Sequence, residues 1–453
     1  MSRQIDFSRI APTVVLGISI ATIVGLAALP ARVGSDAQWL AALGHVISAR
    51  HAIPAGVPFA ASPTGRWPNV LVLAELIFSL LERGLGDRGL MLAQLAAVAG
   101  GLVILARDAR AGGAGAVGTA AALLLVAAGS LPSLAIARVQ LFSLVLFPAL
   151  VALLRAQTRA PSRRIWLAVP LLALWSNLHG AAVLGLGLLL AHLLIERGRR
   201  RPLESVAVAA AGATALCLTP ALGRTVAYYH GVLTNVAAQR GQGMWGPLSL
   251  HSPLDLLLIA AALLLAARMW RGRASPWEWA TLAALAVATV RADRNGVWLL
   301  MFTAGPAARA LSPERSLRLL APIAAVAAAG LIGCAVARGP LRSGASATLV
   351  RGAVALAHGS PVLANGSIDE QVALAGGRIW AGNPIDAFSR AVQTAYLEWS
   401  AGQATGAHAV TAAVRVVLVS RGSPTQALMA SLPGFTVARS DATALLYERR
   451  PTG

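Results

Sequence analysis

The sequence predicts an α-helical polytopic membrane protein with a small C-terminal α/β domain. The 453 residues are 57% hydrophobic and only 12% charged, with a mean hydropathy of +0.67, whereas soluble domains carry about 25% charged residues. Apolar runs long enough to cross a bilayer, roughly 17 to 20 residues, recur along the chain and predict about eleven transmembrane helices. Arginines gather in the short segments between these runs.

The formal net charge of +20 would also suit a nucleic-acid-binding protein, but the positions of the arginines argue against that class. They flank apolar runs, which is the pattern that the positive-inside bias of membrane proteins produces. We therefore expect membrane lipids as partners and no nucleic acid. The absence of lysine, together with abundant alanine and glycine, indicates a bacterial genome rich in G and C.

The apolar runs place spans at residues 10–29, 89–106, 114–135, 139–155, 165–178, 180–195, 203–221, 254–270, 277–291, 295–311 and 319–337. An N-terminus in the cytoplasm puts the dense arginine clusters, near residues 107–110, 155–164, 197–201, 268–273 and 309–318, on one side of the membrane. The odd number of spans then puts the C-terminus outside. The first run is too long for a signal-peptide core and is interpreted as an uncleaved span.

Two segments are constrained by this threading. Residues 69–84 must not cross, and we interpret them as an amphipathic or re-entrant helix in a long outer loop, residues 30–88. The apolar run 165–195 must go out and return, with its turn at "SNLHG". Asn177 and His179 in this turn either satisfy the broken helix ends or line an outward-facing cavity.

The composition changes after the last span, so we expect two domains. Residues 1–338 form the multi-pass domain, and residues 339–453 form an extracytoplasmic α/β domain. Strands are predicted at "PVLANG", "VRVVLVS" and "TALLYE", and helices at "IDAFSRAVQTAYLEWSA" and "SPTQALMASL". A domain of about 110 residues can hold a core of its own.

The outer loop opens with Asp36, which precedes an apolar stripe at helical spacing. Asp36 is therefore either the cap of that helix or a functional carboxylate, and the two roles can coexist. Glu75 and His45 of the same loop are further candidates for lining a cavity. No spacing of side chains is typical of a metal site, and no cofactor is certain.

Four arginines at the predicted outer helix ends are not explained by topology: Arg138, Arg224, Arg291 and Arg294. Guanidinium groups grip phosphate bidentately, so these residues are candidates for binding a phosphate or pyrophosphate group. The alternative is that they extend to lipid head groups and pair locally, for example with Asp293.

The order of several short motifs resembles the GT-C type membrane glycosyltransferases, in particular the bacterial group related to protein mannosyltransferases and Rgt-type sugar transferases. The matching segments are the acidic residue Asp36 after the first span, then "PTGRW", "ARVQLFSLVLF", "LWSNLHG", "LTPALGR", "RADRN" and the tail "DATALLYERR". The resemblance covers nearly the whole chain.

This resemblance implies a hexosyltransferase that takes a sugar from a polyprenyl-phosphate donor and gives it to an envelope acceptor. It places the enzyme in the bacterial inner (plasma) membrane, with catalysis on the outer face and the C-terminal domain in the periplasm. The role of base, or of a metal-assisted acid/base partner, falls on Asp36, and a divalent metal is compatible with it.

Some segments depart from the pattern of the group. Leu40 stands where a histidine is frequent, "WAGNP" (380–384) stands where an Asp-Gly-Arg segment is usual, and "LAELIF" keeps Glu75 without a preceding Glu-Trp-Leu. Two alternatives therefore stay open: a non-catalytic scaffold or glycolipid-binding protein of the same fold, and a transporter or flippase. The few charges at span midplanes disfavour transport.

Overall fold

A computed structural model describes residues 7–65, 67–311, 321–341 and 343–450. Three predicted features lie partly outside the described residues. They are the N-terminal tail with Arg3, the "PTGRW" motif at Arg66, and the arginine-containing segment 312–320. The chain divides into two compact units. The helical unit comprises Met1–Ala31, Met91–Leu218 and Gly243–Pro340, and the α/β unit comprises Arg32–Leu90, Thr219–Gln242 and Leu341–Gly453.

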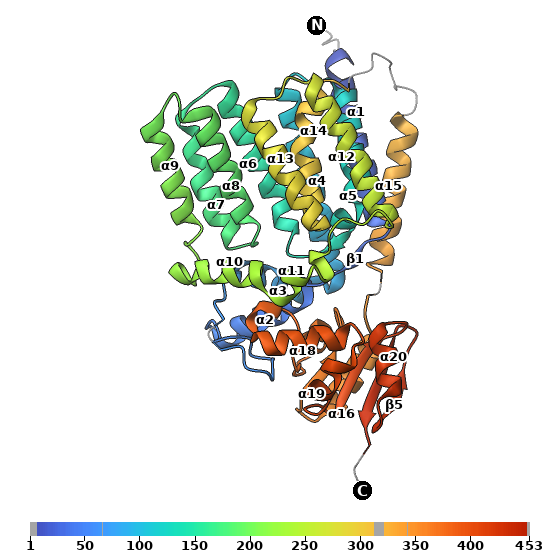
Figure 1. The fold of residues 1–453 in the computed structure, drawn as a ribbon. Helices are drawn as coiled ribbons and strands as arrows, with labels where there is room; N and C mark the ends of the chain where they lie inside the picture. The colour runs from blue at the N-terminus through green and yellow to red at the C-terminus, as the bar shows by residue number, and fades with distance from the viewer. Residues whose placement is uncertain (1–6, 66, 312–320, 342, 451–453) are drawn as a thin grey trace. The chain divides into compact units, whose positions relative to one another are not determined.

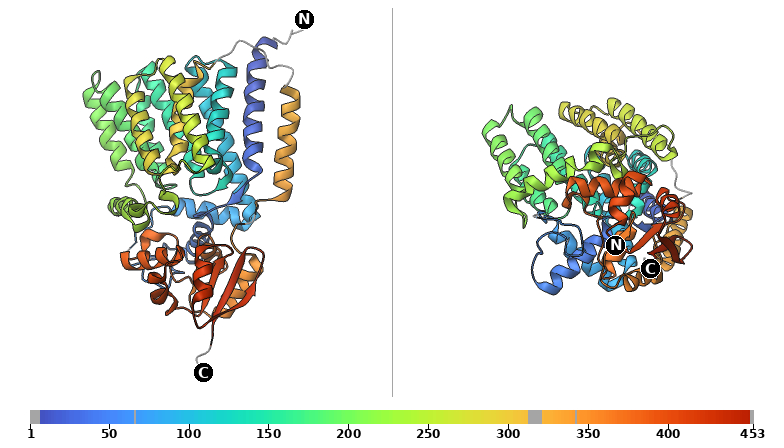
Figure 2. Two further views of the ribbon diagram at one scale, coloured as in Figure 1. Left: turned by 45° about the vertical axis from the view of Figure 1, so that its right-hand side comes forward. Right: turned by 60° about the horizontal axis from the view of Figure 1, so that its bottom comes forward.

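The long helices of the helical unit run side by side (Figures 1 and 2). They are α1 (Phe7–Ala28), most of α4 (Asp87–Ala111), α5 (Ala116–Ala135), α6 (Leu141–Arg159), α7 (Ala168–Ser176), α8 (Ala182–His192), α9 (Pro202–Ala215), α12 (Pro253–Arg271), α13 (Pro276–Arg291), α14 (Gly296–Ala308) and α15 (Ala321–Arg338). A helix therefore lies at each predicted span, although the start of span 319–337 falls outside the described residues.

Among the described residues, four of these helices, α4, α5, α6 and α12, are long and apolar enough to cross a membrane by length and composition. Their outer surface is apolar as well: Leu124 of α5 is 44% exposed and Leu263 of α12 is 66% exposed. Such a surface is stable when lipid surrounds it. The chain is a multi-pass membrane protein, and the number of crossings and their direction stay predictions.

Helix α14 forms the centre of the helical unit, because each of its residues is buried. A helix that is apolar all round is expected in such a position. Residues from the ends of α4, α6 and α14 and from the α12–α13 turn line one shared cavity. The arginine clusters of these segments therefore lie at one end of the unit, and the prediction that this end faces the cytoplasm stays a prediction.

The apolar run 165–195 breaks in two, as its polar centre predicts. It forms a 3-10 turn, η1 (Arg163–Leu167), then α7 and α8, and ends in a π-helical turn, η2 (Leu193–Arg197). The break between α7 and α8 covers residues 177–181. The two helices pack closely, since a Cβ at Gly185 would lie 2.6 Å from the ring of Trp175.

The α/β unit contains a four-stranded sheet in the order β3-β4-β6-β5, in which β3 and β4 are parallel and the other pairs are antiparallel. Its strands are β3 (Val362–Ala364), β4 (Val416–Ser420), β5 (Phe435–Ser440) and β6 (Ala444–Arg449). Its helices are α2 (Ala37–Arg50), α3 (Val72–Leu85), α10 (Thr225–Thr234), α11 (Val236–Arg240), α16 (Ala347–Ala357), α17 (Ile368–Leu374), α18 (Arg390–Ser400), α19 (Ala404–Thr411) and α20 (Pro424–Ser431).

The predicted strands correspond to β3, β4 and β6, and the predicted helices correspond to α18 and α20. The edge strand β5 was missed, because most of its residues are exposed and its sequence lacks an apolar run. Short elements complete the chain: β1 (Arg32–Val33), β2 (Ile136–Ala137), η3 (Leu222–Arg224), η4 (Gly243–Trp245), η5 (Asp293–Asn295) and η6 (Ile385–Ala387). The predicted domain boundary at 338/339 stays a prediction.

Helices α2 and α3 cross at Gly44, so a substitution there tests how closely the two helices pack. A Cβ at Gly44 would collide with the backbone of Glu75 and lie 2.7 Å from Cβ of Ser79. We expect Gly44→Ala to lower the free energy of unfolding by about 1–3 kcal/mol, measured as a fall in the melting temperature of the detergent-solubilised protein.

Gly84 is the matched control, since it lies in α3 and a Cβ added there would have no atom within 4 Å. Gly84→Ala is expected to leave stability unchanged or to raise it by about 0.5–1 kcal/mol. Equal melting temperatures for the two variants would contradict the close crossing.

Candidate active site

The candidate site is built at the N-terminus of α2, within the α/β unit. Asp36 occupies the N-cap position of this helix with φ +80°, in the left-handed region. Non-glycine residues rarely adopt this conformation, although aspartate tolerates it better than most. The side chain of Asp36 makes no capping hydrogen bond, so the structure contradicts the interpretation of Asp36 as a side-chain cap.

Glu370 of α17 provides the cap instead. Its carboxylate accepts hydrogen bonds from the backbone N–H groups of Asp36 at 2.8 Å, Gln38 at 3.3 Å and Trp39 at 3.4 Å. The first N–H groups of a helix lack partners within the helix, and the positive end of the helix dipole favours an anion there. Because Glu370 satisfies these groups, the carboxylate of Asp36 is left available for another role.

Asp36 is held only loosely. Its Oδ1 lies 3.4 Å from the amide nitrogen Nδ2 of Asn383 and 3.5 Å from Nε1 of Trp39. The same Asn383 amide donates a shorter hydrogen bond, 2.7 Å, to Glu370. In the described part of the chain no hydrogen bond reaches Oδ2 of Asp36, and the residue is partly exposed. The arrangement orients the carboxylate and leaves one of its oxygens open.

Two further carboxyl groups belong to the same unit: Asp369, which is buried, and Asp386, which is partly buried. Asp369 accepts hydrogen bonds from the hydroxyl of Tyr396 at 3.0 Å and from the backbone N–H of Glu370 at 2.6 Å. Asp386 accepts one from the indole N–H of Trp67 at 2.8 Å. Each carboxyl is therefore fixed in place by a donor.

Burial raises the pKa of three carboxyl groups near Asp36, those of Asp369, Glu370 and Asp386. Burial raises the pKa of Asp369 to about 7 and that of Asp386 to about 6, and the charge of Asp36 raises both further. Burial, followed by the charges of Asp369 and Asp36, raises the pKa of Glu370 well above its usual range. Desolvation and like charges both favour the neutral acid, and the hydrogen bonds from the Asp36 backbone and the Asn383 amide lower the pKa of Glu370 only in part.

The donor set does not fit a resident metal ion. The oxygens of Glu370 already accept backbone and amide hydrogen bonds, and those of Asp369 accept bonds from Tyr396 and the backbone. Across the described residues, no group of three or more histidine, cysteine, aspartate or glutamate side chains is arranged to hold a metal ion. We therefore derive no chemical step through a metal.

Glu75 and His45, the other two candidates from the segment 30–88, have different surroundings. Glu75 is fully buried and accepts a hydrogen bond from Asn69 at 2.9 Å. Burial raises its pKa to about 8, and the Asn69 hydrogen bond lowers it only in part. His45 lies 3.1 Å from the carboxylate of Glu82, and both side chains are partly exposed. That Glu75 and His45 line a cavity stays a prediction.

Two of the four predicted phosphate-binding arginines meet in the helical unit. Arg138 and Arg294 line a cavity of about 230 Å³ together with Gln140, Asp255 and Asp293, among other residues. The guanidinium of Arg294 also lies 4.7 Å from the ring centroid of Trp245. The exposed Arg291 is not among the residues that line this cavity, and the exposed Arg224 belongs to the α/β unit.

Asn177 and His179 satisfy hydrogen bonds around the break between α7 and α8. The amide of Asn177 donates to the carbonyls of Ala173 at 2.8 Å and Leu218 at 2.7 Å. Nδ1 of His179 lies 2.6 Å from the hydroxyl oxygen of Ser143, which accepts a hydrogen bond from the indole of Trp175. These contacts match the first of the two alternatives, and a cavity-lining role stays a prediction.

Glu370, Asn383, Asp369 and Asp386 were not predicted from the sequence. Asn383 lies in the "WAGNP" segment that departs from the family pattern. Asp369 and Glu370 follow shortly after the buried strand β3, and this position was a usable signal. Their role as partners of α2 was hidden because Glu370 contacts Asp36 across 334 positions of sequence.

The described fold is similar to solved glycosyltransferase structures. ArnT from Cupriavidus metallidurans bound to undecaprenyl phosphate matches with a TM-score of 0.57 and 14% identity, over 97% of this chain and 98% of that one. The apo state of ArnT matches with a TM-score of 0.56 and 14% identity, over 96% and 97% of the chains. Arabinofuranosyltransferase AftD from Mycobacteria aligns with 99% of this chain and 42% of its own, with a TM-score of 0.49 and 16% identity.

No protein-family model and no curated protein matches the sequence. The similarity to ArnT nevertheless shows that the chain has a GT-C-type glycosyltransferase fold. The resemblance that the short motifs indicated is thereby confirmed at the level of the fold.

The buried Glu75 predicts how stability depends on pH. Because its folded-state pKa is raised from 4.5 to about 8, its stabilising contribution is complete below about pH 4.5 and is lost as the pH rises through about 8. The loss approaches about 1.4 kcal/mol per pH unit within this window. We expect Glu75→Gln to be increasingly more stable than the wild type between pH 5 and 8, as measured by melting temperature.

Glu82→Gln is the control, since Glu82 lies on the same helix but is partly exposed. Because Glu82→Gln removes only a partly exposed pair with His45, its stability is expected to stay within about 1 kcal/mol of the wild type at each pH. A difference between Glu75→Gln and the wild type that stays constant with pH would contradict the role of burial at Glu75.

Proposed function

We propose that the protein is an integral membrane glycosyltransferase that transfers a sugar from a polyprenyl-phosphate donor to a cell-envelope acceptor. The GT-C-type fold supports the class, and the ArnT structure with bound undecaprenyl phosphate supports the kind of donor. The observation that carries the proposal is the capping of α2 by Glu370. It leaves Asp36 oriented, partly exposed and free of a structural task.

In the proposed reaction, Asp36 is the general base. The acceptor hydroxyl gives its proton to the open oxygen of Asp36 while the acceptor oxygen forms a bond to the anomeric carbon of the sugar. The bond from that carbon to the phosphate oxygen breaks, and its electron pair leaves with the polyprenyl phosphate. A positioned base must lie within hydrogen-bond reach of the proton it removes, and the long contacts from Asn383 and Trp39 to Oδ1 favour an orientation that leaves Oδ2 open.

We assign binding of the donor phosphate to Arg138 and Arg294. Both line one polar cavity of the helical unit, and guanidinium groups stabilise the negative charge that develops on a leaving phosphate. Arg224 and Arg291 stay predicted members of this group. The proposal also places the protein in the bacterial inner membrane, with the C-terminal α/β domain in the periplasm, because an odd number of spans follows an N-terminus in the cytoplasm.

Replacing Asp36 tests the proposed base. We expect Asp36→Asn to lower the transfer rate by about 10²–10⁴-fold, because the amide cannot accept the hydroxyl proton. The measurement is mass spectrometry of envelope glycans and lipid-linked sugars in a deletion strain that carries either the wild type or the variant, at equal abundance in the membrane. Asp87→Asn, the same change at an exposed position of the α/β unit, should restore the wild-type glycan.

Full restoration of the glycan by Asp36→Asn would overturn the assignment of Asp36. If the deletion strain loses the glycan while its lipid-linked precursor is still present, the defect lies in the transfer step, as proposed. Accumulation of a lipid-linked sugar on one side of the membrane, with no bond made by the purified protein, would instead favour a flippase.

The arginine cavity has a separate test. Charge-assisted hydrogen bonds contribute about 1.5–3 kcal/mol, so Arg138→Gln should weaken binding of undecaprenyl phosphate to the purified protein by roughly 10- to 100-fold. Binding is measured by titration of the lipid in detergent. Arg291→Gln removes the same charge from an exposed side chain outside the cavity and is expected to have a smaller effect. Equal losses would indicate that phosphate binding extends to the other predicted arginines, Arg224 and Arg291.

A further inference from the structure

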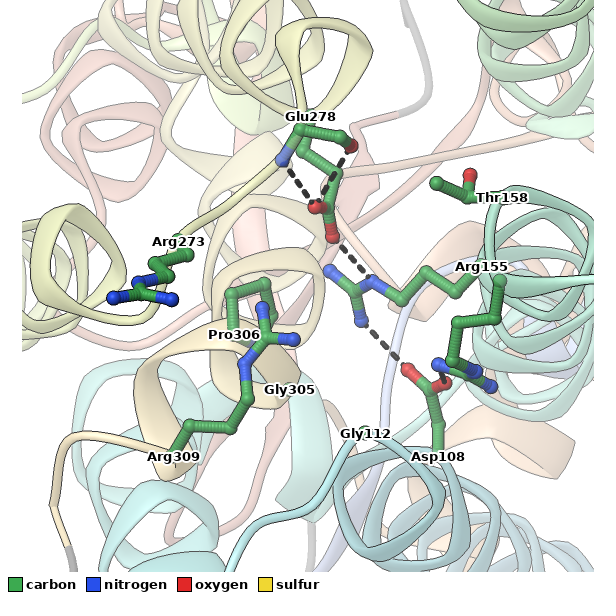
Figure 3. Close-up of a pocket in the computed structure, with 11 residues that line it drawn as sticks. Asp108, Gly112, Arg155, Thr158, Arg273, Glu278, Gly305, Pro306 and Arg309 are labelled. Carbon is green, nitrogen blue, oxygen red and sulfur yellow. Dashed lines mark hydrogen bonds and ion pairs between the residues drawn. The ribbon is translucent and has the colours of Figure 1, made fainter.

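A second polar cavity lies in the helical unit, at the end that carries the arginine clusters (Figure 3). Its floor is an ion network centred on Arg155, which is 5% exposed. Arg155 donates to Asp108 of α4 at 2.7 Å, to Glu278 of α13 at 2.8 Å and to the carbonyl of Phe302 in α14. One cation thus joins three helices to α6.

Both oxygens of Glu278 accept hydrogen bonds in this network, whereas Oδ1 of Asp108 is buried and accepts none from the described residues. The second oxygen of Glu278 accepts hydrogen bonds from the backbone N–H and hydroxyl of Ser275, each at 2.9 Å. The second oxygen of Asp108 lies 3.5 Å from the guanidinium of Arg159. The packing is close as well, since a Cβ at Gly305 would lie 2.6 Å from Nη1 of Arg155. The network therefore fixes Arg155 in place, and its two carboxylates offset only part of the positive charge of the arginines that line the cavity.

Further arginines line the cavity above this floor. Four arginines, Arg155, Arg159, Arg273 and Arg309, line the cavity together with only two carboxylates. Within the described ranges, neither Arg273 nor Arg309 forms an ion pair with an acidic side chain, and Nε of Arg309 is buried without a hydrogen-bond partner. The cavity therefore has an excess of positive charge and unused donors.

The size of the cavity fits a small oxyanion. Its volume is about 100 Å³, which corresponds to roughly three water molecules at about 30 Å³ each. Figure 3 shows the guanidinium of Arg309 beside Gly305 and Pro306, turned toward Arg155. A guanidinium group can donate two parallel hydrogen bonds to two oxygens of one phosphate.

Two tryptophans near the α12–α13 turn indicate where the cavity lies relative to the lipid head groups of the membrane. Trp270 is 78% exposed, and its ring lies edge-on to that of Trp279, with the centroids 5.6 Å apart. Exposed tryptophans of membrane proteins gather at the level of the lipid head groups. Arg273 lies in the turn between these tryptophans, so the cavity is at a depth where phosphate groups of lipids are abundant.

We propose that this cavity is a binding site for a phosphate group, held by Arg159, Arg273 and Arg309 over the Asp108–Arg155–Glu278 network. The phosphate group is carried either by the head group of an anionic lipid or by free phosphate. Its binding joins the ends of α6 and α14 and the α12–α13 turn and relieves repulsion among their arginines. The positive-inside bias accounts for arginines at this end but not for their convergence on one cavity.

The test uses the purified full-length protein in neutral detergent and measures its melting temperature as ligand is added. The ligand arms are phosphatidylglycerol, diacylglycerol with the same acyl chains, inorganic phosphate, and chloride at matched ionic strength. We expect phosphatidylglycerol to raise the melting temperature and diacylglycerol and chloride to leave it unchanged. Stabilisation by inorganic phosphate as well would identify free phosphate as a sufficient ligand.

Three variants locate the effect. Arg309→Gln and Arg273→Gln should each weaken the apparent affinity for the stabilising ligand about tenfold or more. Arg271→Gln, the same change at the exposed last residue of α12, which does not line the cavity, should leave the affinity as in the wild type. Arg273 is itself exposed, so its variant keeps the test valid if Arg309→Gln fails to fold.

The proposal is overturned if neither phosphate-bearing ligand stabilises the wild type. It is also overturned if Arg271→Gln weakens binding as much as Arg273→Gln does, because binding would then follow the net charge of the surface. This outcome is independent of the glycan measurements on Asp36, which can succeed or fail separately.

Discussion

The α/β unit depends on one interaction, the capping of α2 by the carboxyl group of Glu370. The free N–H groups at the start of a helix require an acceptor, and the sequence places Asp36 where such an acceptor is normally found. The acceptor comes instead from α17, and the same carboxyl binds the amide of Asn383. The availability of the Asp36 carboxylate follows from this exchange of roles, whereas the pKa of Glu370 is raised by its burial and by the charges of Asp369 and Asp36.

In the helical unit, the surroundings of the charged groups decide their arrangement. Apolar side chains cover the outer faces of the helices, and α14 is buried on every side. Buried charges are tolerated only where they are paired and hydrogen-bonded, and Arg155 satisfies this condition with two carboxylates and a carbonyl. The arginines that lack such partners are found around cavities and helix ends, where water, lipid or a ligand can reach them.

Local sequence patterns predicted the helices, the break between α7 and α8 and three of the four strands of the α/β unit, because apolar periodicity and turn residues act over short distances. They also identified Asp36 and brought attention to Arg138 and Arg294. They could not predict Glu370 or Asn383 as partners of α2. The donors that Glu370 binds are backbone N–H groups, which nearly every residue carries, so the sequence around Glu370 does not indicate which of them it binds. Asp36 itself was ambiguous for the same reason, since a cap and a functional carboxylate share one position.

The distance in sequence between Asp36 and Glu370, 334 positions, has a consequence for biosynthesis. Chains emerge from the ribosome N-terminus first and fold as their segments appear, so α2 is made long before its cap. The carboxylate of Asp36 reaches its final environment only after α17 and the segment with Asn383 have been translated. A chain that stops short of them cannot complete the proposed catalytic geometry, and the site is therefore assembled only in a finished protein.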